Sequence, residues 1–179
     1  MATLAKYLEK MSHDRQAVAD VIAALASVAV DLSSLIRRPD ALAEFGAVCG
    51  SANADGDYQK KLDVLADEMI SDALAELTAV AAYLSEERDV AIPFHESGAV
   101  IVASDPLDGS SNIDTNVSIG TIFSIFPASG GPLQPGRNQL ASGIFVYGPQ
   151  TGLLVTFGDG VNAFQLDNDG HFYDMGWRV

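Results

Sequence analysis

Apolar residues recur every three or four positions through the first half of the chain, a spacing typical of helices. The segment from Asp14 to Arg38 is rich in Ala, Val, Leu and Ile and holds no Gly or Pro, so it predicts a long, mostly buried helix. Pro39 and Asp40 are expected to end it. A second apolar stripe, from Lys60 to about Ala82, predicts another long helix.

The second half of the chain has the pattern of a β-sheet. Short runs rich in β-branched and aromatic residues are separated by Gly, Pro and Asn, and they read AYLSEE, GAVIVAS, GTIFSIF, SGIFVYG, GLLVTF and NAFQLD. These runs predict five or six strands. Two helices before a set of strands indicate a layered α+β domain over residues 1–179, with the helices on one face of a mixed, largely antiparallel sheet.

The Gly-rich stretch between the two predicted helices is expected to be a loop. Residues 46–57 read GAVCGSANADGD, and glycines among small polar residues favour a mobile segment. Long loops of this kind are often functional.

The charge balance narrows the possible partners. The chain holds 24 acidic and 10 basic residues, a formal net charge of −14. Such a chain repels nucleic acid and anionic membranes, so neither is expected as a partner. An anionic substrate would need local neutralisation, which divalent cations held by carboxylates supply.

Cysteine content and the N-terminus bear on location. The single cysteine, Cys49, excludes an intrachain disulfide, and the histidines lack zinc-ligand spacing. The N-terminal residues carry charges throughout instead of a basic start and an apolar core. We expect a cytoplasmic protein.

The string VASDPLDGSSNID, residues 102–114, predicts a metal site. Asp105 is expected at the carboxyl end of a strand, where α/β sites collect their chemistry. Pro106 favours an extended backbone at Asp105, which would present the Leu107 carbonyl between the carboxylates of Asp105 and Asp108. Three oxygen ligands of this kind suit Mg²⁺.

The residues after these aspartates are suited to bind a phosphate. Gly109 allows a close turn, and Ser110 and Ser111 with the following Asn are typical of helix starts, whose free N–H groups bind anions. Metal carboxylates followed at once by an anion cradle indicate phosphoryl chemistry.

Two further acidic pairs are candidates. Glu86 and Glu87 follow an apolar run, and in a strand they would point to opposite sides, so that one binds metal and the other orients water. A two-metal site could then form. Asp63 and Asp67 are four residues apart and share a helix face, and a solvated helix edge is the favoured interpretation of that pair.

These motifs together resemble the class I fructose-1,6-bisphosphatases. DPLDGSSNID is followed by GTIF, with KKLDVLADEM and LSEE upstream and LQPGRNQLASG downstream, all in the family's order over Asp57 to about Asp167. The inositol monophosphatases share the Asp-Pro-Leu/Ile-Asp-Gly core but lack the Ser-Asn-Ile-Asp and Gly-Thr-Ile-Phe segments. The resemblance implies the sugar-phosphatase fold and its N-terminal half.

The resemblance also implies roles at the metals. Glu86, Asp105, the Leu107 carbonyl and Asp108 match the family's metal ligands, and Glu87 matches a residue that holds or activates the water. The metal implied is Mg²⁺, as two or more ions, with Mn²⁺ or Zn²⁺ as substitutes. The activity implied is hydrolysis of the 1-phosphate of fructose 1,6-bisphosphate, in gluconeogenesis or carbon fixation.

Further matches follow from the same resemblance. Asp63 matches a carboxylate that assists proton transfer, and Asp57 matches one that a mobile loop delivers. The matches to the cradle of the 1-phosphate are Gly109, Ser110 and Ser111, and the matches to positions near the metals are Asp114 and Thr121. A homo-oligomer, dimer or tetramer, is implied as well.

Two departures from the family limit this interpretation. Members are close to twice as long, with a second domain that contacts the sugar and the 6-phosphate, so this chain is expected to be an incomplete catalytic unit. Sedoheptulose-1,7-bisphosphatase activity and a non-catalytic metal-binding or assembly fragment therefore stay open. The Lys and Arg of the vertebrate AMP site are replaced by uncharged residues at 99–100 and 126–127, so AMP inhibition of that type is not expected.

Overall fold

The computed structural model describes residues 1–38 and 57–178. Its helices are α1 (Leu4–Leu8), α2 (Gln16–Ile36) and α4 (Asp57–Ala75), with short 3₁₀ turns η1 (His13–Arg15), η2 (Ser110–Thr115), η3 (Ala128–Gly130) and η4 (Gly136–Asn138). The strands are β1 (Val80–Ser85), β2 (Ile92–Pro93), β3 (Val100–Asp108), β4 (Ile119–Pro127), β5 (Ala141–Tyr147), β6 (Thr151–Thr156), β7 (Val161–Leu166) and β8 (Phe172–Arg178).

All the strands join one sheet in the order β2-β1-β3-β4-β5-β6-β7-β8. Strands β1 and β3 are parallel, and every other neighbouring pair is antiparallel. The predicted mixed, largely antiparallel sheet is therefore confirmed. The expected five or six strands become eight, because the two-residue β2 and the terminal β8 carry too little apolar alternation to be recognised.

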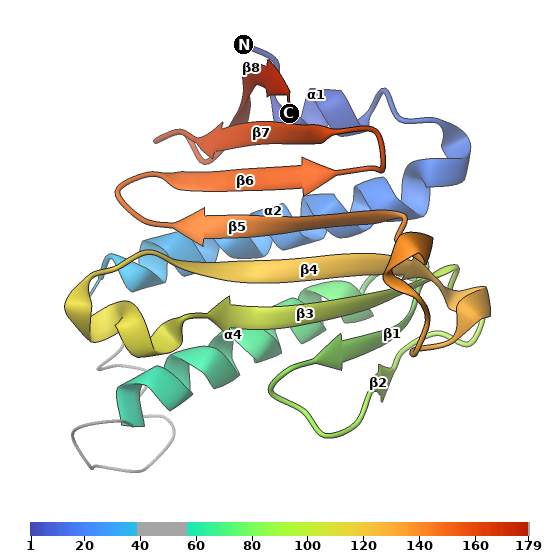
Figure 1. Ribbon diagram of the computed structural model, residues 1–179, viewed down its shortest axis with the longest axis horizontal. Helices are drawn as coiled ribbons and strands as arrows, with labels where there is room; N and C mark the ends of the chain where they lie inside the picture. The colour runs from blue at the N-terminus through green and yellow to red at the C-terminus, as the bar shows by residue number, and fades with distance from the viewer. Residues whose placement is uncertain (39–56, 179) are drawn as a thin grey trace.

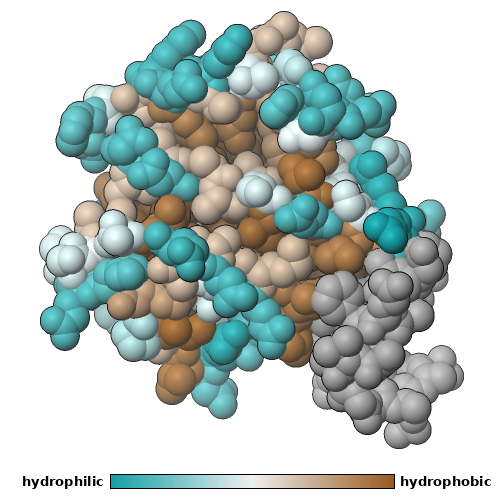
Figure 2. All heavy atoms as spheres, turned by 180° about the vertical axis from the view of Figure 1, so that it is seen from behind, coloured by the Kyte–Doolittle hydropathy of each residue, from teal (hydrophilic) through white to brown (hydrophobic). Residues whose placement is uncertain are grey.

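Helices α2 and α4 lie together across one face of this sheet, as Figure 1 shows. Helix α2 packs on α4 and contacts β5, while α4 contacts β1, β3 and η2. Ten residues of α2 are buried, which confirms the predicted long core helix. The segment His13–Ile36 is long and apolar enough to span a membrane by length and composition alone, and half of its most apolar window is buried within the fold. Seen from the helix side, hydrophilic side chains cover much of the surface (Figure 2).

Alternation along the central strands builds the core beneath the helices. The side chains of Phe123 on β4, Phe145 on β5 and Leu153 on β6 are at most 1% exposed. The paired row Ile122, Ile144 and Leu154 points to the opposite face, because side chains alternate along a strand and directly opposed residues share a face. Leu154 is 37% exposed there.

The second predicted helix was wrong at its end. It was expected to run to about Ala82, but α4 ends at Ala75, and β1 begins at Val80. Leu77 and Val80 continue the helical spacing by coincidence, while Val80 pairs with Val100 of β3 in the parallel ladder. Parallel strands buried on both faces read as continuous apolar runs, which spacing alone does not separate from a helix.

Candidate metal and phosphate site

The aspartate motif lies on a bulged stretch of β3. The strand does not end at Asp105, as expected, but continues to Asp108, and its register with β4 shifts between these two residues. Asp105 pairs with Ile122 and Asp108 with Gly120, so three steps along β3 oppose two along β4. Pro106 has no N–H to give to the ladder, which favours a bulge here, and bulges redirect side chains beside active sites.

Two hydrogen bonds hold the bulge in shape. The Leu107 N–H donates to Asp105 Oδ1 at 3.1 Å. The buried Thr121 hydroxyl donates to the Pro106 carbonyl oxygen at 2.8 Å and also pairs with the Tyr147 hydroxyl at 2.9 Å. Thr121 therefore shapes the backbone under the two aspartates. The Leu107 side chain itself is buried, so its carbonyl is the atom open to a ligand role.

The chain turns immediately after Asp108 into the predicted helical start. Gly109 has a φ of 77°, a left-handed conformation that glycine adopts without strain. Ser110 begins η2, and its hydroxyl donates to Asp63 Oδ2 of α4 at 3.0 Å. This bond links the expected phosphate cradle, Gly109 to Ser111, to a carboxylate from a distant part of the sequence.

Glu86 and Glu87 are placed differently from the prediction. They were expected within a strand, pointing to opposite sides, but β1 ends at Ser85 and both follow it in a turn. The Glu86 N–H still donates to the Ser104 carbonyl at 3.0 Å, which keeps this turn beside β3. Both side chains are exposed and are thus free to rotate toward a cation.

The carboxylates of this region repel one another. Partial burial and repulsion from Glu86 raise the pKa of Asp63, whereas the hydrogen bond from Ser110 lowers it by a smaller amount. Burial raises the pKa of Asp105, as do the charges of Asp108, Glu86 and Asp63, while the Leu107 N–H lowers it. Lost hydration and the charges of Asp63 and Glu86 raise the pKa of Glu87. Five carboxylates, from α4, β3 and the turn after β1, thus face one region.

This cluster fits a hard divalent cation in its donor chemistry. All donors are oxygens, and Asp63 Oδ1 is buried with no hydrogen-bond partner, a cost that a cation or its water would remove. Within the described residues, no three His, Cys, Asp or Glu side chains already form a ligand sphere. Binding would therefore require the exposed glutamates to turn inward.

Two predicted site residues fall at the limit of what the structure describes. Asp57 was expected in the Gly-rich loop, but it is the first residue of α4, and its side chain lies outside the described residues. Loop residues 46–56 also lie outside them. Asp114 is within η2, and its side chain is not described either.

Comparison with known proteins identifies the family. Residues 3–175 match the family described as fructose-1-6-bisphosphatase, N-terminal domain. The chain belongs to this family. A protein of Shewanella amazonensis named fructose-1,6-bisphosphatase class 1 is 46% identical over 93% of this chain and 53% of its own length. One of the same name from Rhodopseudomonas palustris is 49% identical over 89% of this chain and 47% of its own.

A solved structure agrees with these sequence matches. The crystal structure of Leishmania major fructose-1,6-bisphosphatase in holo form superposes with a TM-score of 0.82 at 29% identity, over 97% of this chain and 54% of that one. The chain therefore spans about half the length of the fructose-1,6-bisphosphatases it matches. The fold predicted by resemblance is confirmed.

The sequence interpretation missed a buried network behind the candidate site. Asp67 was expected on a solvated helix edge, but it is 3% exposed and bonds to Tyr83 and Arg88. The helical spacing of Asp63 and Asp67 was the available signal. It did not show that the tyrosine of β1 reaches the helix.

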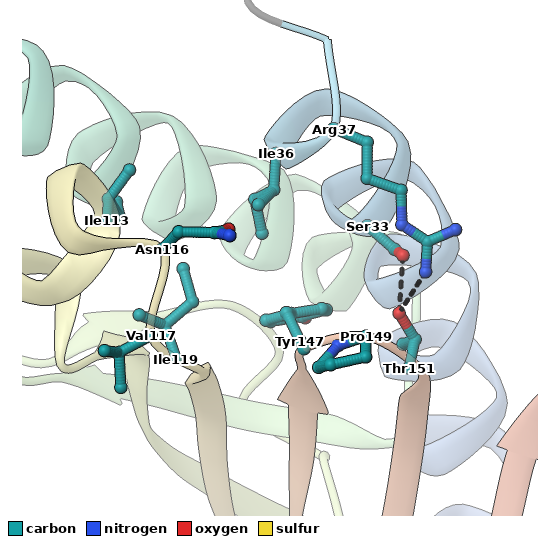
Figure 3. A pocket seen from close by; sticks show the side chains of 11 residues that line it. Ser33, Ile36, Arg37, Ile113, Asn116, Val117, Ile119, Tyr147, Pro149 and Thr151 are labelled. Atoms are coloured by element: carbon teal, nitrogen blue, oxygen red, sulfur yellow. Dashed lines mark hydrogen bonds between the residues drawn. The ribbon is translucent and has the colours of Figure 1, made fainter.

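A cavity beside η2 is lined by none of the residues of the carboxylate cluster. It measures about 720 Å³ and lies between the end of α2 and the strand ends that Tyr147 and Thr151 mark (Figure 3). The buried Ser33 and Thr151 hydroxyls pair at 2.6 Å, and Arg37 donates to Thr151 at 3.1 Å. Among the described residues that line it, none is a carboxylate.

Removing one charge from the cluster is expected to stabilise the chain without metal. Because the pKa of Asp105 is raised on folding, the folded chain binds protons more tightly. The Asp105 contribution to stability is thus greatest at acidic pH and is lost as pH rises from the ordinary carboxyl value through the raised one. After allowance for solvent screening, Asp105→Asn at pH 7 should add less than about 1 kcal/mol, a rise in Tm of up to about 2–4 °C.

Thermal unfolding in a chelating buffer checks this expectation. The gain should disappear as the pH falls below about 3.9, the ordinary carboxyl pKa, because Asp105 is then protonated in both states. Asp31→Asn, which neutralises an exposed carboxylate on α2, should leave the Tm nearly unchanged. A lower Tm for Asp105→Asn at pH 7 would contradict the repulsion described above.

Proposed function

We propose that this chain supplies the metal and phosphate side of a catalytic unit that hydrolyses the 1-phosphate of fructose 1,6-bisphosphate with Mg²⁺, giving fructose 6-phosphate. The observation that carries the proposal is the approach of five carboxylates to a Gly-Ser-Ser turn. Relatives at 46–49% identity bear the name fructose-1,6-bisphosphatase class 1.

The residues proposed to hold the cations are Glu86, Asp105 and Asp108, with the Leu107 carbonyl. Bound Mg²⁺ ions would polarise the phosphoryl group and lower the pKa of a coordinated water. Oxygen donors of this kind match what Mg²⁺ prefers. Mn²⁺ or Zn²⁺ is proposed as a substitute.

Two carboxylates are proposed to handle protons. The pKa of Asp63 and that of Glu87 are both raised, so each can accept a proton more readily than an ordinary carboxylate. Glu87 would accept the proton of the attacking water at a carboxylate oxygen. Asp63 would exchange a proton through the Ser110 hydroxyl that it already binds. Asp57 is proposed as a third contributor.

The turn after Asp108 is proposed to bind the phosphate that is transferred. Gly109 reverses the chain, and the first N–H groups of the following turn, at Ser110 and Ser111, lack partners in its own hydrogen-bonding pattern. An anion bound there would lie next to the carboxylates. Cations between the two would then screen the repulsion between substrate and protein.

The same observations leave two other outcomes. Sedoheptulose 1,7-bisphosphate presents a similar 1-phosphate, so it is the alternative substrate. The chain spans about half the length of its relatives, which favours a metal-binding fragment without turnover when it acts alone. The homo-oligomer and the cytoplasmic location stay predictions.

Phosphate release tests the proposal. We would compare this chain with a longer protein that continues it with the second half its relatives carry, on both bisphosphates, with Mg²⁺ and with chelator. Turnover of fructose 1,6-bisphosphate by the longer protein, lost in chelator and weak or absent in the chain alone, is expected. Preference for the seven-carbon substrate would support the alternative, and no turnover of either would overturn the proposal.

A further inference from the structure

Behind the carboxylate cluster, one buried hydroxyl joins three elements. The Tyr83 side chain on β1 is fully buried, and its hydroxyl donates to Asp67 Oδ1 of α4 at 3.0 Å. The Ser104 hydroxyl of β3 lies 2.7 Å from the Tyr83 hydroxyl oxygen. Because the tyrosine proton goes to Asp67, Ser104 is the donor in the second bond. Tyr83 therefore fixes α4, β1 and β3 to one point.

Asp67 is a buried carboxylate whose partners, Tyr83 and Arg88, come from β1 and the segment directly after it. Its other oxygen, Oδ2, accepts a hydrogen bond from the Arg88 guanidinium. The side chain of Asp67 is 4% exposed, and that of Arg88 is 36% exposed. A buried carboxylate is tolerated when it is paired and hydrogen-bonded, as here. Since Asp67 is committed to Arg88 and Tyr83, it is not available as a metal ligand.

The three partners joined through Tyr83 or Asp67 each lie close in sequence to a carboxylate of the cluster. Asp67 lies one helical turn after Asp63, and Ser104 directly precedes Asp105. Arg88 follows Glu87 in the turn after β1. The network thus has one member on α4, one on β3 before the bulge and one directly after the Glu86–Glu87 turn.

At the site itself, repulsion acts to separate the elements that the network joins. Asp63, Glu87 and Asp105 face one another across α4, the β1 turn and β3, and like charges favour their separation. Apolar packing of α4 on β1 and β3 opposes that separation, and hydrogen bonds between the elements add to it. Backbone pairing of Ser85 with Ser104 joins β1 to β3. Hydrogen bonds join α4 to β1, through Tyr83 and Asp67, and to η2, through Ser110 and Asp63.

We propose that Tyr83, Asp67 and Arg88 are positioning residues that set the spacing of the carboxylate cluster by fixing α4, which carries Asp63, to the ends of β1 and β3. This inference rests on the proposed function, because it assumes that the carboxylates bind a divalent cation. The inference goes beyond that function in one respect: the affinity for the cation depends on residues that do not themselves bind the cation. Pre-organised ligands lose less freedom on binding, so loosening the network lowers affinity.

The test is the affinity of the chain for Mn²⁺, measured by calorimetry well below the unfolding temperature. Tyr83→Phe removes one oxygen and keeps the ring in the core, and Asp67→Asn keeps the shape but removes the charge that Arg88 binds. Each is expected to weaken Mn²⁺ binding about tenfold, at the lower end of the range for residues that support a metal's ligands. Arg88→Lys should recover part of the affinity that Arg88→Ala loses.

Ser33→Ala is the matched control, since it removes a buried hydroxyl bond between α2 and β6 away from the carboxylates. It should lower the Tm as Tyr83→Phe does, yet leave Mn²⁺ affinity unchanged. Unchanged affinity in both Tyr83→Phe and Asp67→Asn, with binding by the native chain, overturns the positioning role alone. If the native chain binds no Mn²⁺, the proposed metal site and the positioning role both fail.

Discussion

Asp108→Asn in the longer, active protein is expected to reduce phosphate release from fructose 1,6-bisphosphate about a hundred- to a thousandfold. Asp108 is exposed at the end of β3, directly before the Gly109 turn. The amide keeps one oxygen but removes the charge that a cation would neutralise there, and losses of this size follow when one stabilising group is removed from a charged transition state. Initial rates over a range of Mg²⁺ concentrations measure the effect.

The Mg²⁺ dependence separates a metal ligand from a merely nearby charge. For a ligand, the Asp108→Asn protein should need more Mg²⁺ for half its maximal rate. Asp72→Asn, which neutralises an exposed carboxylate on α4 outside the cluster, should retain close to full activity. Equal rates for native and Asp108→Asn proteins would remove Asp108 from the site.

Leu153→Ala should destabilise the chain by about 2–5 kcal/mol, whereas Leu154→Ala should cost less than about 1 kcal/mol. These neighbours on β6 differ only in which face they occupy. Leu153 is fully buried beneath the helices, and Leu154 is 37% exposed on the opposite face. Truncating the first leaves a cavity in a packed core, and truncating the second removes a side chain that solvent already reaches.

Denaturant unfolding of both variants measures the difference. Native chains are stable by only about 5–15 kcal/mol, so Leu153→Ala removes a large share of the total. Equal losses in the two variants would mean that both faces of the sheet are covered. A larger loss for Leu154→Ala would mean that the register of β6 is shifted by one residue.

Local patterns predicted most of the fold. The period of α2 and the alternation along β4 to β6 are properties of short windows, and each such window can bury its apolar side in only one way. The end of α4 could not be predicted in this way, because Leu77 and Val80 satisfy a helix and a buried parallel strand equally well. Pairing of Val80 with Val100 decides the matter, and that pairing is not local.

The candidate site likewise has a part that the sequence predicts and a part that depends on non-local contacts. Asp105, Asp108 and the Gly109 turn stand together in the sequence, so the motif itself places them close in space. Approach of Asp63 to this motif depends on the Ser110 bond and on how α4 crosses the sheet. The bulge at Pro106, which carries β3 on to Asp108, arises from the register with β4.

Asp67 shows what spacing along a helix cannot reveal. Its place one turn after Asp63 fits a solvated edge and a buried charge equally, since a helix wheel does not say what packs against it. The partners that make burial possible, Tyr83 and Arg88, come from β1 and the turn after it. Neither residue belongs to the motifs through which the family was recognised.

The measurement that tests the proposed function most directly is a ³¹P NMR time course of fructose 1,6-bisphosphate with the longer protein and Mg²⁺. We expect the signal of the 1-phosphate to disappear as inorganic phosphate appears, while the 6-phosphate signal persists and chelator stops the reaction. Release of the 6-phosphate first, or an unchanged spectrum with Mg²⁺ present, would contradict the proposal that this chain binds the 1-phosphate beside a carboxylate metal site.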